Sequence, residues 1–489
     1  MRKVIYKCAI SLALLSSAAS CSSDESKLTG IWHTELEAIP QLKSAFDLEL
    51  NHDFFGDKWS GRFEIAETMT EGNLSSVNID GSKITLDLGQ GAMFKGNLAN
   101  NKQEISGVLH VPGIEKQTLR FTKIEKWSSQ RPARSDRDNQ PVKIWAYQAP
   151  PEIHDGWKVG TVNTSTEASK PLRDLFENIL KGNFNGLDAI LVARNGKLLL
   201  EEYFYMGDRE RIHSIQSCTK SVTSLLIGIA HDDGLIKNLD APVNTFFPAY
   251  GDSTKQKMPP FTLRNALTMS AALDWREDIP YSDLRNDAVL MNQSKDMFQY
   301  VLSKKPDPTV RPGEVFEYNS GLSILLGGVI ANTTGKPADQ YATQTLFKDL
   351  GINKFTWTAM NGQIHTGGGL FMKPRDILKL GQLVLDEGKW NDKQIVSASW
   401  IKESTAFNLP VNKANKEWGY GYQWWRGVLR AENKVFKTIY AAGYGGQVLC
   451  VIPDLDLVIL TLHHNATEGN GRRSILWKEM ETNILPAFK

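Results

Sequence analysis

Residues 213–230 read HSIQSCTKSVTSLLIGIA, with a serine three positions before a lysine. The part that follows the lysine is apolar almost all round, which predicts a helix buried inside the protein. In the first turn of that helix, Ser217 and Lys220 share one face. A buried lysine needs a partner or a shifted pKa, and these are the conditions under which a lysine accepts a proton. The stretch therefore makes Ser217 a candidate nucleophile, with Lys220 as its base and the positive end of the helix beside it.

A second Ser-x-x-Lys at residues 399–402 serves as an internal comparison. It lies in VSASWIKEST, residues 396–405, where polar and charged residues surround it. Ser397 or Ser399 is suited to cap the helix that begins there, so we interpret this copy as a helix cap. The same interpretation exists for Ser217, as a cap followed by a lysine whose stem packs on apolar side chains while its amine reaches water. The motif alone does not separate the two.

Two further segments carry polar residues and glycines next to apolar elements. In FEYNSGLSILLGGVI, residues 316–330, Tyr318, Asn319 and Ser320 form a turn before a second apolar helix. Near the C-terminus, AAGYGGQ at residues 441–447 joins two strands, and its glycines let a substrate approach the backbone closely. Both segments are candidates to meet the serine of the first motif in one site.

The order of these three segments resembles the serine β-lactamase and penicillin-binding-protein superfamily. Within it the chain is most similar to the β-lactamase-related serine hydrolases, which include class C β-lactamases, carboxylesterases and 6-aminohexanoate-dimer hydrolases. The similarity covers about residues 186–465. It includes LTMSAALDW at 267–275, HTGGGLFMKPRDILKLGQL at 365–383 and GYGYQWW at 419–425. The resemblance implies a β-lactamase/transpeptidase-like antiparallel sheet with flanking helices and a helical subdomain.

The resemblance also implies roles for the catalytic residues. Ser217 matches the acylated nucleophile, and Lys220 matches the lysine that takes or relays its proton. Tyr318 matches the tyrosine that acts as a base or protonates the leaving group. The backbone N–H groups of Ser217 and Tyr444 match the oxyanion hole. Which of Lys220 and Tyr318 is the base during acylation stays open.

Other positions match the part of the family's site that binds substrate. Asn319 and Gly443 fall in these binding segments, and Ser320 stands where class C enzymes have an asparagine. Ala441 and Ala442 stand where lactamases carry the first two residues of Lys-Thr-Gly or a similar triplet. They offer neither a cation nor a hydroxyl to the carboxylate of a penicillin. The resemblance therefore favours small esters or amides over β-lactams.

The remaining sequence divides into an all-β part, a linker and a mixed part. Residues 28–125 show short alternating strands, with Asp80 and Gly81 at a hairpin turn, and they loosely resemble lipocalin-like domains. This part is a spacer or lid, or else it binds a ligand. Residues 126–160 are polar and charged at their start and form a linker. Residues 161–489 begin and end with strands and have helices between them, which predicts one antiparallel sheet and an α+β fold.

The first 27 residues have the composition of an export signal. Residues 1–20 run from a basic start through a short apolar stretch to small residues, as in a secretory signal peptide. Cys21 follows the small residues directly and is the expected lipidation site of a bacterial lipoprotein, with residues 21–27 as a tether. We expect a periplasmic protein of the bacterial cell envelope that meets the membrane only through this anchor. Cleavage without lipidation is the alternative.

Charge and cysteine content exclude other classes of function. The chain of 489 residues has 56 basic and 55 acidic residues, so it has no electrostatic footprint for nucleic acid. Of its four cysteines only Cys218 and Cys450 lie in the folded part, as free thiols or as a disulfide, and neither has a neighbour spaced for a metal site. His463 and His464 are adjacent in a strand and point to opposite faces, so we expect no metal and no cofactor.

The sequence thus predicts an exported serine hydrolase that forms an acyl-enzyme on Ser217 and acts on a small-molecule ester, amide or β-lactam. A true β-lactamase or D-Ala-D-Ala carboxypeptidase is one alternative. A catalytically silent ligand-binding lipoprotein is another, although such a protein has no reason to retain the serine, the lysine and the tyrosine together. Trp418, Trp424 and Trp425 either line an apolar pocket for the substrate or pack in the core.

Overall fold

The computed structural model describes most of the chain after the first 27 residues. The described residues are 28–39, 42–53, 58–65, 70–89, 91–111, 115–128, 133–135, 140–183, 186–205, 207–250, 261–281, 283–412, 414–464 and 477–488. The predicted signal peptide, the lipidation site Cys21 and the tether therefore lie outside the described residues. Within the described ranges, no helix is both long and apolar enough to cross a membrane. The chain forms two compact units, Met1–Arg131 and Pro132–Lys489.

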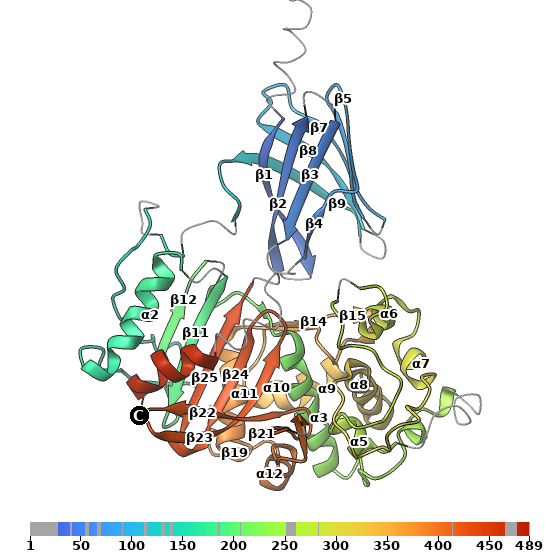
Figure 1. Cartoon of the computed structure of the whole chain (residues 1–489), viewed down its shortest axis with the longest axis vertical. Coiled ribbons are helices and arrows are strands. Elements are labelled where there is room, and N and C mark those ends of the chain that lie inside the picture. The colour runs from blue at the N-terminus through green and yellow to red at the C-terminus, as the bar shows by residue number, and fades with distance from the viewer. Residues whose placement is uncertain are drawn as a thin grey trace, which may run out of the picture. The chain divides into compact units, whose positions relative to one another are not determined.

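The described residues of the first unit form one antiparallel sheet of nine strands (Figure 1). Most strands pair with their neighbours in sequence, and β1 also pairs with β9, which gives the order β4-β3-β2-β1-β9-β8-β7-β6-β5. The prediction of an all-β domain is confirmed. The strands are β1 (Gly30–Ile39), β2 (Leu42–Asp53), β3 (Lys58–Ile65), β4 (Thr70–Asn73), β5 (Ser76–Asp80), β6 (Lys83–Gly89), β7 (Ala92–Leu98), β8 (Glu104–His110) and β9 (Gln117–Ile124).

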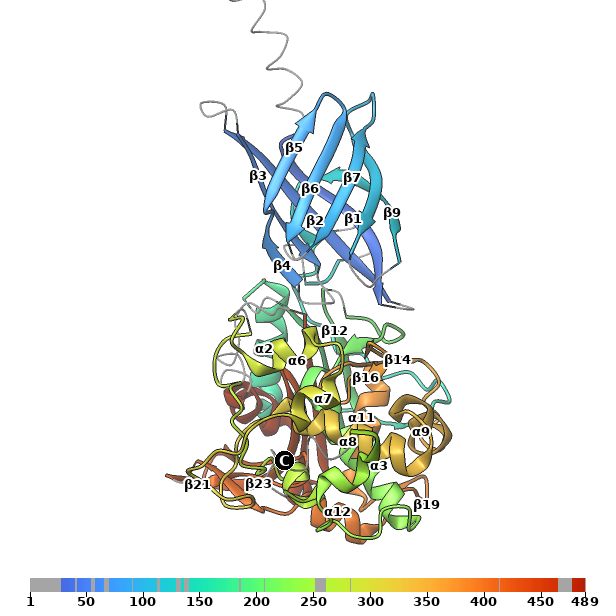
Figure 2. The same ribbon diagram turned by 90° about the vertical axis from the view of Figure 1, so that its right-hand side faces the viewer.

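Apolar side chains that alternate along the strands fill the inside of this curled sheet. Phe46, Phe94 and Phe121 are fully buried, and Phe121 meets the other two rings edge to face at centroid distances of 5.2 and 5.4 Å. Figure 2 shows how the sheet curls, and only residues 74 and 75 separate its two edge strands, β4 and β5, in the chain. Aromatic rings therefore occupy the interior of the described part of this unit.

The hairpin between β5 and β6 turns one residue later than predicted. Asp80 pairs with Lys83, so Gly81 and Ser82 are the turn residues, and Gly81 has a φ of 59°. The prediction that Asp80 and Gly81 make the turn is wrong by one position, because Asp80 continues the strand.

The segment predicted as a linker belongs largely to the second unit. The boundary between the units falls at Arg131. Within residues 140–160, the ring centroid of Trp145 lies 4.6 Å from that of Phe176, and the ring is buried. The aromatic residues of this segment therefore pack on the second unit, and the predicted linker is too long.

A sheet of nine described strands forms the centre of the second unit, in the order β10-β12-β11-β25-β24-β23-β22-β21-β20. β10 runs parallel to β12, and the other neighbours are antiparallel. β11, from the start of the unit, pairs with β25, from its end, which confirms an antiparallel sheet closed by distant parts of the chain. The strands are β10 (Lys158–Val159), β11 (Leu187–Arg194), β12 (Lys197–Tyr203), β20 (Leu409–Asn412), β21 (Asn415–Tyr420), β22 (Trp425–Ala431), β23 (Lys434–Gly443), β24 (Gln447–Ile452) and β25 (Leu457–His463).

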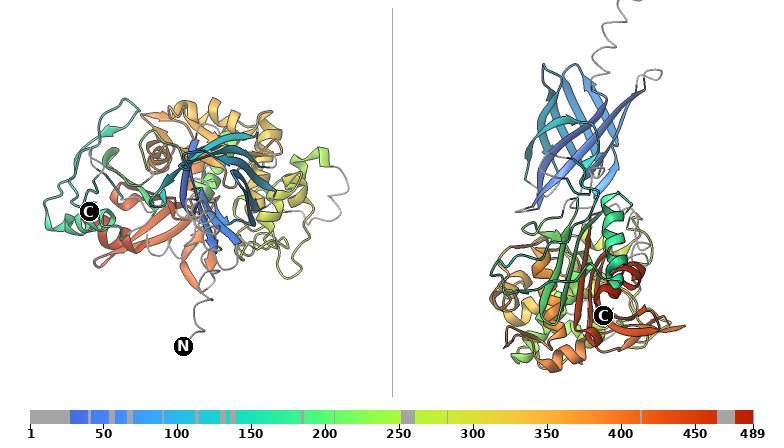
Figure 3. Two further views of the ribbon diagram at one scale, coloured as in Figure 1. Left: turned by 90° about the horizontal axis from the view of Figure 1, so that it is seen from above. Right: turned by 90° about the vertical axis from the view of Figure 1, so that its left-hand side faces the viewer.

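Helical segments cover both faces of this sheet, so its central strands are buried on both sides. In β11, Leu191 belongs to a core with the helices α3 (Thr219–Asp232), α8 (Ser320–Thr334) and α11 (Pro374–Leu385). Ile190 belongs to a second core, with α2 (Lys170–Leu180) and the C-terminal residues 477–488. The right-hand view of Figure 3 shows α2 and the C-terminal segment together beside the strands.

Shorter helices and strands complete the second unit next to α3 and α8. The helices are α5 (Leu263–Leu267), α6 (Asp287–Gln293), α7 (Met297–Leu302), α9 (Ala338–Gln344), α10 (Leu346–Asp349) and α12 (Ala398–Ser404). The short strands are β13 (His213–Ser214), β14 (Phe355–Trp357), β15 (Ala359–Met360), β16 (Gln363–Ile364), β17 (Leu370–Met372), β18 (Lys389–Trp390) and β19 (Lys393–Gln394). Together with the large sheet they confirm the predicted α+β fold.

Candidate active site

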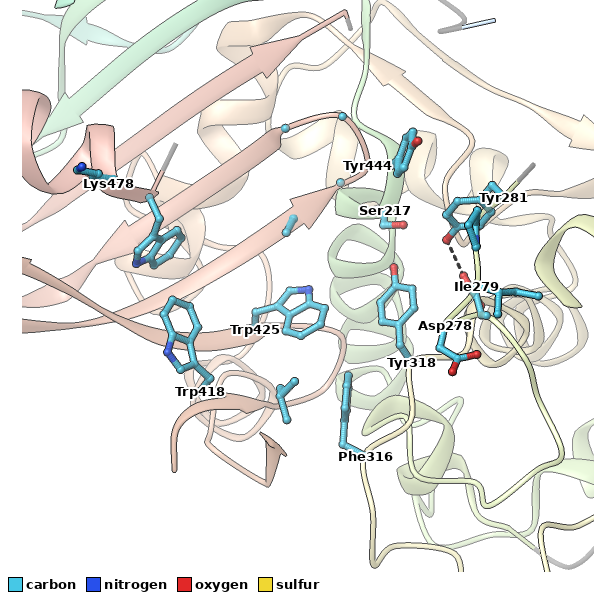
Figure 4. A pocket seen from close by; sticks show the side chains of 18 of the residues that line it. Ser217, Asp278, Ile279, Tyr281, Phe316, Tyr318, Trp418, Trp425, Tyr444 and Lys478 are labelled. Carbon is cyan, nitrogen blue, oxygen red and sulfur yellow. Dashed lines mark hydrogen bonds between the residues drawn. The ribbon is translucent and has the colours of Figure 1, made fainter. Parts of the chain in front are cut away.

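Ser217 lies in a single 3₁₀ turn, Gln216–Cys218, that leads directly into α3. Most of α3 is buried, as its apolar sequence predicts, so the turn is anchored to the core of the unit. Gln216 has a φ of 47°, in the left-handed region that a residue with a side chain rarely adopts. The serine itself is half-buried and lines a large pocket (Figure 4).

Lys220 is fixed next to this serine on the same face of the helix. Its side chain is buried, with 2% of the residue exposed, and Nζ donates a hydrogen bond to Ser217 Oγ at 2.9 Å. A second hydrogen bond from Nζ reaches the backbone carbonyl of Gly367. Nζ also lies 5.1 Å from the ring centroid of Tyr318. The amine therefore does not reach water, and the interpretation of Lys220 as a surface-reaching lysine beside a capping serine is wrong.

The Gly-rich segment at residues 365–369 supplies the second partner of this lysine. Thr223 of α3 donates to the carbonyl of Thr366 at 3.0 Å, which holds the segment along the helix. His365, in the same segment, donates a hydrogen bond from Nε2 to Asn292 Oδ1 at 3.1 Å. Burial, and next the charge of Lys220, lowers the pKa of His365 to about 4, so this ring is neutral near pH 7.

Tyr318 lies beside the nucleophile at the start of α8. Its ring stacks on Trp425 of β22 with a centroid distance of 5.9 Å and an interplanar angle of 20°. In Figure 4 its hydroxyl points toward Ser217. The structure thus brings together the three residues that the sequence proposes as catalytic: Ser217, Lys220 and Tyr318.

The end of β23 passes so close to the nucleophile turn that only glycine fits there. A Cβ on Gly443 would lie 2.4 Å from the carbonyl oxygen of Ile215. Tyr444 follows, partly exposed, and its ring meets that of Tyr281 edge to face at 5.6 Å. Gly443 and Tyr444 both line the pocket, so the turn that carries the predicted oxyanion N–H is next to Ser217.

Gln447, at the start of β24, fixes this turn from inside the protein. The side chain is fully buried, and Nε2 donates to the carbonyls of Tyr444 at 3.3 Å and of His463 at 2.7 Å. Oε1 accepts from the N–H of His463 at 3.0 Å. The amide thereby ties the Tyr444 peptide to the end of β25. Sequence reasoning gave this residue no role, although it quoted the segment that contains it.

Asn319 and Ser320 have partners other than a substrate. Asn319 is buried, and its side chain accepts from the N–H of Leu322 as the N-cap of α8. Ser320 donates its hydroxyl to Glu277 at 2.6 Å, and its N–H donates to the same carboxylate at 2.7 Å. Neither residue is among those that line the pocket. Both residues thus belong to the N-terminus of α8, and the substrate contact predicted for them stays a prediction.

Two residues of the pocket wall were missed by the sequence. Glu277 also accepts hydrogen bonds from Trp275 Nε1 and from the hydroxyl of Tyr281, both at 2.8 Å. Burial and the neighbouring carboxylate raise the pKa of Tyr281, so its phenol stays protonated and donates. Both residues come from an irregular segment without a motif, and only the fold brings them into the same pocket as Ser217; Figure 4 shows Tyr281 there.

The pocket around these residues has a volume of about 1330 Å³. Its lining is mainly aromatic and apolar and includes charged groups at both ends. The lining residues are Ser217, Glu277, Asp278, Ile279, Pro280, Tyr281, Phe316, Tyr318, Val411, Trp418, Trp425, Ala442, Gly443, Tyr444, Gly445, Gly446, Trp477, Lys478, Glu481 and Thr482.

The comparison motif at residues 399–402 has the geometry of a helix start. Ser397 is the N-cap of α12 and accepts from the N–H of Trp400 at 3.1 Å. Ser399 donates only to the hydroxyl of Ser397, at 3.0 Å. The interpretation as a cap is confirmed, with Ser397 as the capping residue.

Other polar clusters in the described residues are structural. In the first unit His33, Asp47 and Ser128 contact one another, but His33 uses the same ring nitrogen, Nδ1, toward both partners. A catalytic histidine uses its two different nitrogens for the carboxylate and the serine, so this cluster is no triad. Cys218 and Cys450 are both buried free thiols, which rules out a disulfide between them. Within the described ranges no group of three or more His, Cys, Asp or Glu side chains is arranged so that it could hold a metal ion.

Comparisons with known proteins agree with this geometry. Residues 172–481 match the family model described as Beta-lactamase. The chain is 25% identical over 298 residues to the 6-aminohexanoate-dimer hydrolase of Paenarthrobacter ureafaciens. This alignment covers 56% of this chain and 72% of the relative. A presumed 6-aminohexanoate-dimer hydrolase from Bacillus anthracis superposes with a TM-score of 0.54 at 22% identity, over 69% of this chain and 87% of the other. The structure of EstCE1, a hydrolase with promiscuous acyltransferase activity, matches with a TM-score of 0.50 at 17% identity, over 65% and 98%. The chain belongs to the beta-lactamase family and is a serine hydrolase.

Proposed function

We propose that the protein hydrolyses small esters or amides through an acyl-enzyme on Ser217. The observation that carries this proposal is the hydrogen bond between Lys220 Nζ and Ser217 Oγ at 2.9 Å, on the wall of an open pocket and beside Tyr318. A nucleophile needs a group within hydrogen-bond reach that takes its proton, and this pair has that geometry. Ser399, in the comparison motif, has no such hydrogen bond with Lys402.

The residues of the site account for each step of the reaction. Ser217 Oγ bonds to the substrate carbonyl carbon, and its proton passes to the pair formed by Lys220 and Tyr318. The backbone N–H groups of Ser217 and Tyr444 hold the negative oxygen of the intermediate. The proton then moves to the leaving oxygen or nitrogen as its bond to carbon breaks. Water enters, gives its proton to the same pair, and releases the acid with return of the proton to Ser217.

The absence of a cation at the end of β23 supports esters and amides over β-lactams. Ala441 is buried, and Ala442 presents only a methyl group to the pocket. A hydrogen bond to a charged group is worth about 1.5–3 kcal/mol, and a penicillin carboxylate would lose that contact here. Among the lining residues of the pocket, Lys478 is the single cation, and it lies at the far end from Ser217 (Figure 4).

The N-terminal residues complete the proposal with a location. The signal-like residues 1–20 and Cys21 make this a periplasmic lipoprotein of the bacterial cell envelope, held at the membrane by its lipid alone. Replacing Cys21 by alanine should release the protein from the membrane fraction. Detection of an unmodified N-terminus on a soluble protein would contradict the anchor and leave only the export.

Labelling with a fluorophosphonate tests the proposed chemistry against the decoy. We expect modification of Ser217, and loss of labelling and of ester hydrolysis in Ser217→Ala. The matched variant Ser399→Ala should keep both, because it removes a hydroxyl at the same spacing from a lysine. Unchanged hydrolysis in Ser217→Ala would refute the site. An unlabelled Ser217 together with no hydrolysis of esters, amides or nitrocefin would favour a silent ligand-binding protein.

A further inference from the structure

The pocket is much larger than a small acyl group requires. Pockets for small ligands commonly measure about 300–1,000 Å³, and this one reaches about 1330 Å³. From Ser217 it extends past Tyr318 and Trp425 toward Trp418, as Figure 4 shows. We call the part lined by Phe316, Trp418, Trp425 and Trp477 the aromatic arm.

The rings of the aromatic arm are held in place by one another and by a buried tyrosine. Trp425 stacks on Tyr440 with a centroid distance of 6.1 Å and an interplanar angle of 16°. Trp418 lies 5.2 Å from Trp477, and Tyr440 lies 4.8 Å from Trp477. Trp477 also donates its indole N–H to the carbonyl of Val428. The surface is therefore rigid before any ligand binds, which lowers the entropy cost of binding.

Proton transfer decides which part of the substrate meets this arm. The leaving oxygen or nitrogen must receive a proton from Lys220 or Tyr318. The side chain of Lys220 is buried, whereas Tyr318 lines the pocket. The leaving group therefore departs on the Tyr318 side. Because the ring of Tyr318 stacks on Trp425, a group attached to the leaving oxygen extends along Trp425 into the aromatic arm.

The charges around the pocket agree with a neutral group in this place. Glu277 and Asp278 also line the pocket, and the carboxylate of Glu277 accepts from the N–H of Ser320 at the N-terminus of α8. At the far end of the arm, Lys478 and Glu481 carry opposite charges and select neither sign. Between these ends the wall of the arm is aromatic, and offset stacking and edge contacts favour planar rings.

We infer that the aromatic arm binds the leaving group, and that the preferred substrates are esters or amides of aromatic alcohols or amines. The inference rests on the proposed hydrolase function and adds the class of leaving group to it. Trp425 and Trp418 are then the residues that determine specificity.

Esters of one acid with alcohols of similar acidity test this assignment. We expect wild-type protein to hydrolyse 2-naphthyl acetate with at least tenfold higher kcat/KM than phenyl acetate. In Trp418→Ala this leaving-group ratio should fall to about threefold or less. The acyl ratio, phenyl benzoate over phenyl acetate, should change by less than about twofold between the two proteins. Comparing ratios between proteins removes the intrinsic reactivity of each ester.

Two further variants keep the test independent of folding. Trp418→Phe retains a smaller ring, and we expect an intermediate leaving-group ratio at an unchanged melting temperature. Trp59→Ala removes a half-buried tryptophan of the first unit and should leave the ratio as it is.

The possible results separate the two proposals. Equal kcat/KM for the two acetates, in a protein whose Ser217 is labelled, overturns the leaving-group assignment and leaves the hydrolase standing. A change of the acyl ratio in Trp418→Ala, without a change of the leaving-group ratio, overturns it as well, because the arm would then hold the acyl group. No hydrolysis of any ester and no labelling means that the proposed function itself fails.

Discussion

Acid should destabilise the active site through His365. The pKa of this histidine is lowered to about 4 by burial and by the charge of Lys220, whereas an unfolded chain has its histidines near 6.5. Between these values the unfolded state binds a proton that the folded state does not. The free energy of unfolding therefore falls as the pH falls from about 6.5 to about 4, and this contribution is fully present above 6.5.

The size of the effect follows from the same two pKa values. Between pH 7 and pH 4.5, the protonation of His365 in the unfolded state lowers the free energy of unfolding by about 2.5 kcal/mol. Glu317 opposes it in wild-type protein, because burial and nearby carboxylates raise its pKa to about 7 and its contribution is lost as the pH rises. Glu317 is half-exposed, so solvent screening makes its effect the smaller of the two.

Urea unfolding at the two pH values measures this contribution by difference. In His365→Gln the amide can still meet Asn292, and Glu317 acts equally in both proteins. We expect wild type to lose about 2.5 kcal/mol more than the variant between pH 7 and pH 4.5, at equal m-values. Equal losses in the two proteins would refute the reasoning, since the proton would then be taken up elsewhere.

Two variants and one substrate probe the site directly. Tyr318→Phe should slow ester hydrolysis by roughly a hundredfold or more through loss of a proton-transfer group, and near wild-type kcat would remove Tyr318 from the mechanism. Gln447→Leu should lower kcat at least tenfold with little change of KM, because the turn that carries the Tyr444 N–H loses its support; a change in KM alone would assign Gln447 to binding. Nitrocefin should be turned over with a kcat/KM about ten- to a hundredfold below that of a variant with a cation at position 441, such as Ala441→Lys. A wild-type kcat/KM for nitrocefin above that for the best ester would show that another cation replaces the missing one.

The contact between Ser217 and Lys220 was predictable because the information for it is local. Ser217 and Lys220 sit three residues apart on a helix that the sequence marks as buried, and burial forces the lysine onto its neighbours. The alternating pattern of short strands likewise predicted the all-β first unit. Strands at both ends of the second unit predicted that distant parts of the chain pair in one sheet. The decoy at residues 399–402 shows the same spacing on a polar helix, and it has no catalytic geometry.

Asn319 has a structural role at the N-terminus of α8 that the sequence also signals. Asparagine directly before an apolar helix is a strong N-cap, and the structure gives Asn319 that role. The first N–H groups of a helix have no partner within the helix, and the N–H of Ser320 donates to the carboxylate of Glu277. The carboxylate that meets these groups, Glu277, lies 43 residues earlier than Ser320 in an irregular segment. No local pattern connects the two.

The proposed preference for neutral esters and amides over substrates with a carboxylate rests on three features of the pocket. Ala441 and Ala442 remove the cation that would attract one. Glu277 lines the same pocket as Ser217, and its carboxylate accepts hydrogen bonds from the N–H of Ser320 at the N-terminus of α8 and from the phenol of Tyr281. The aromatic arm offers neutral rings on the side where the leaving group departs. Under the proposed function, a β-lactam finds no cation for its carboxylate at this strand, whereas a neutral aryl ester needs none and places its ring on the aromatic arm.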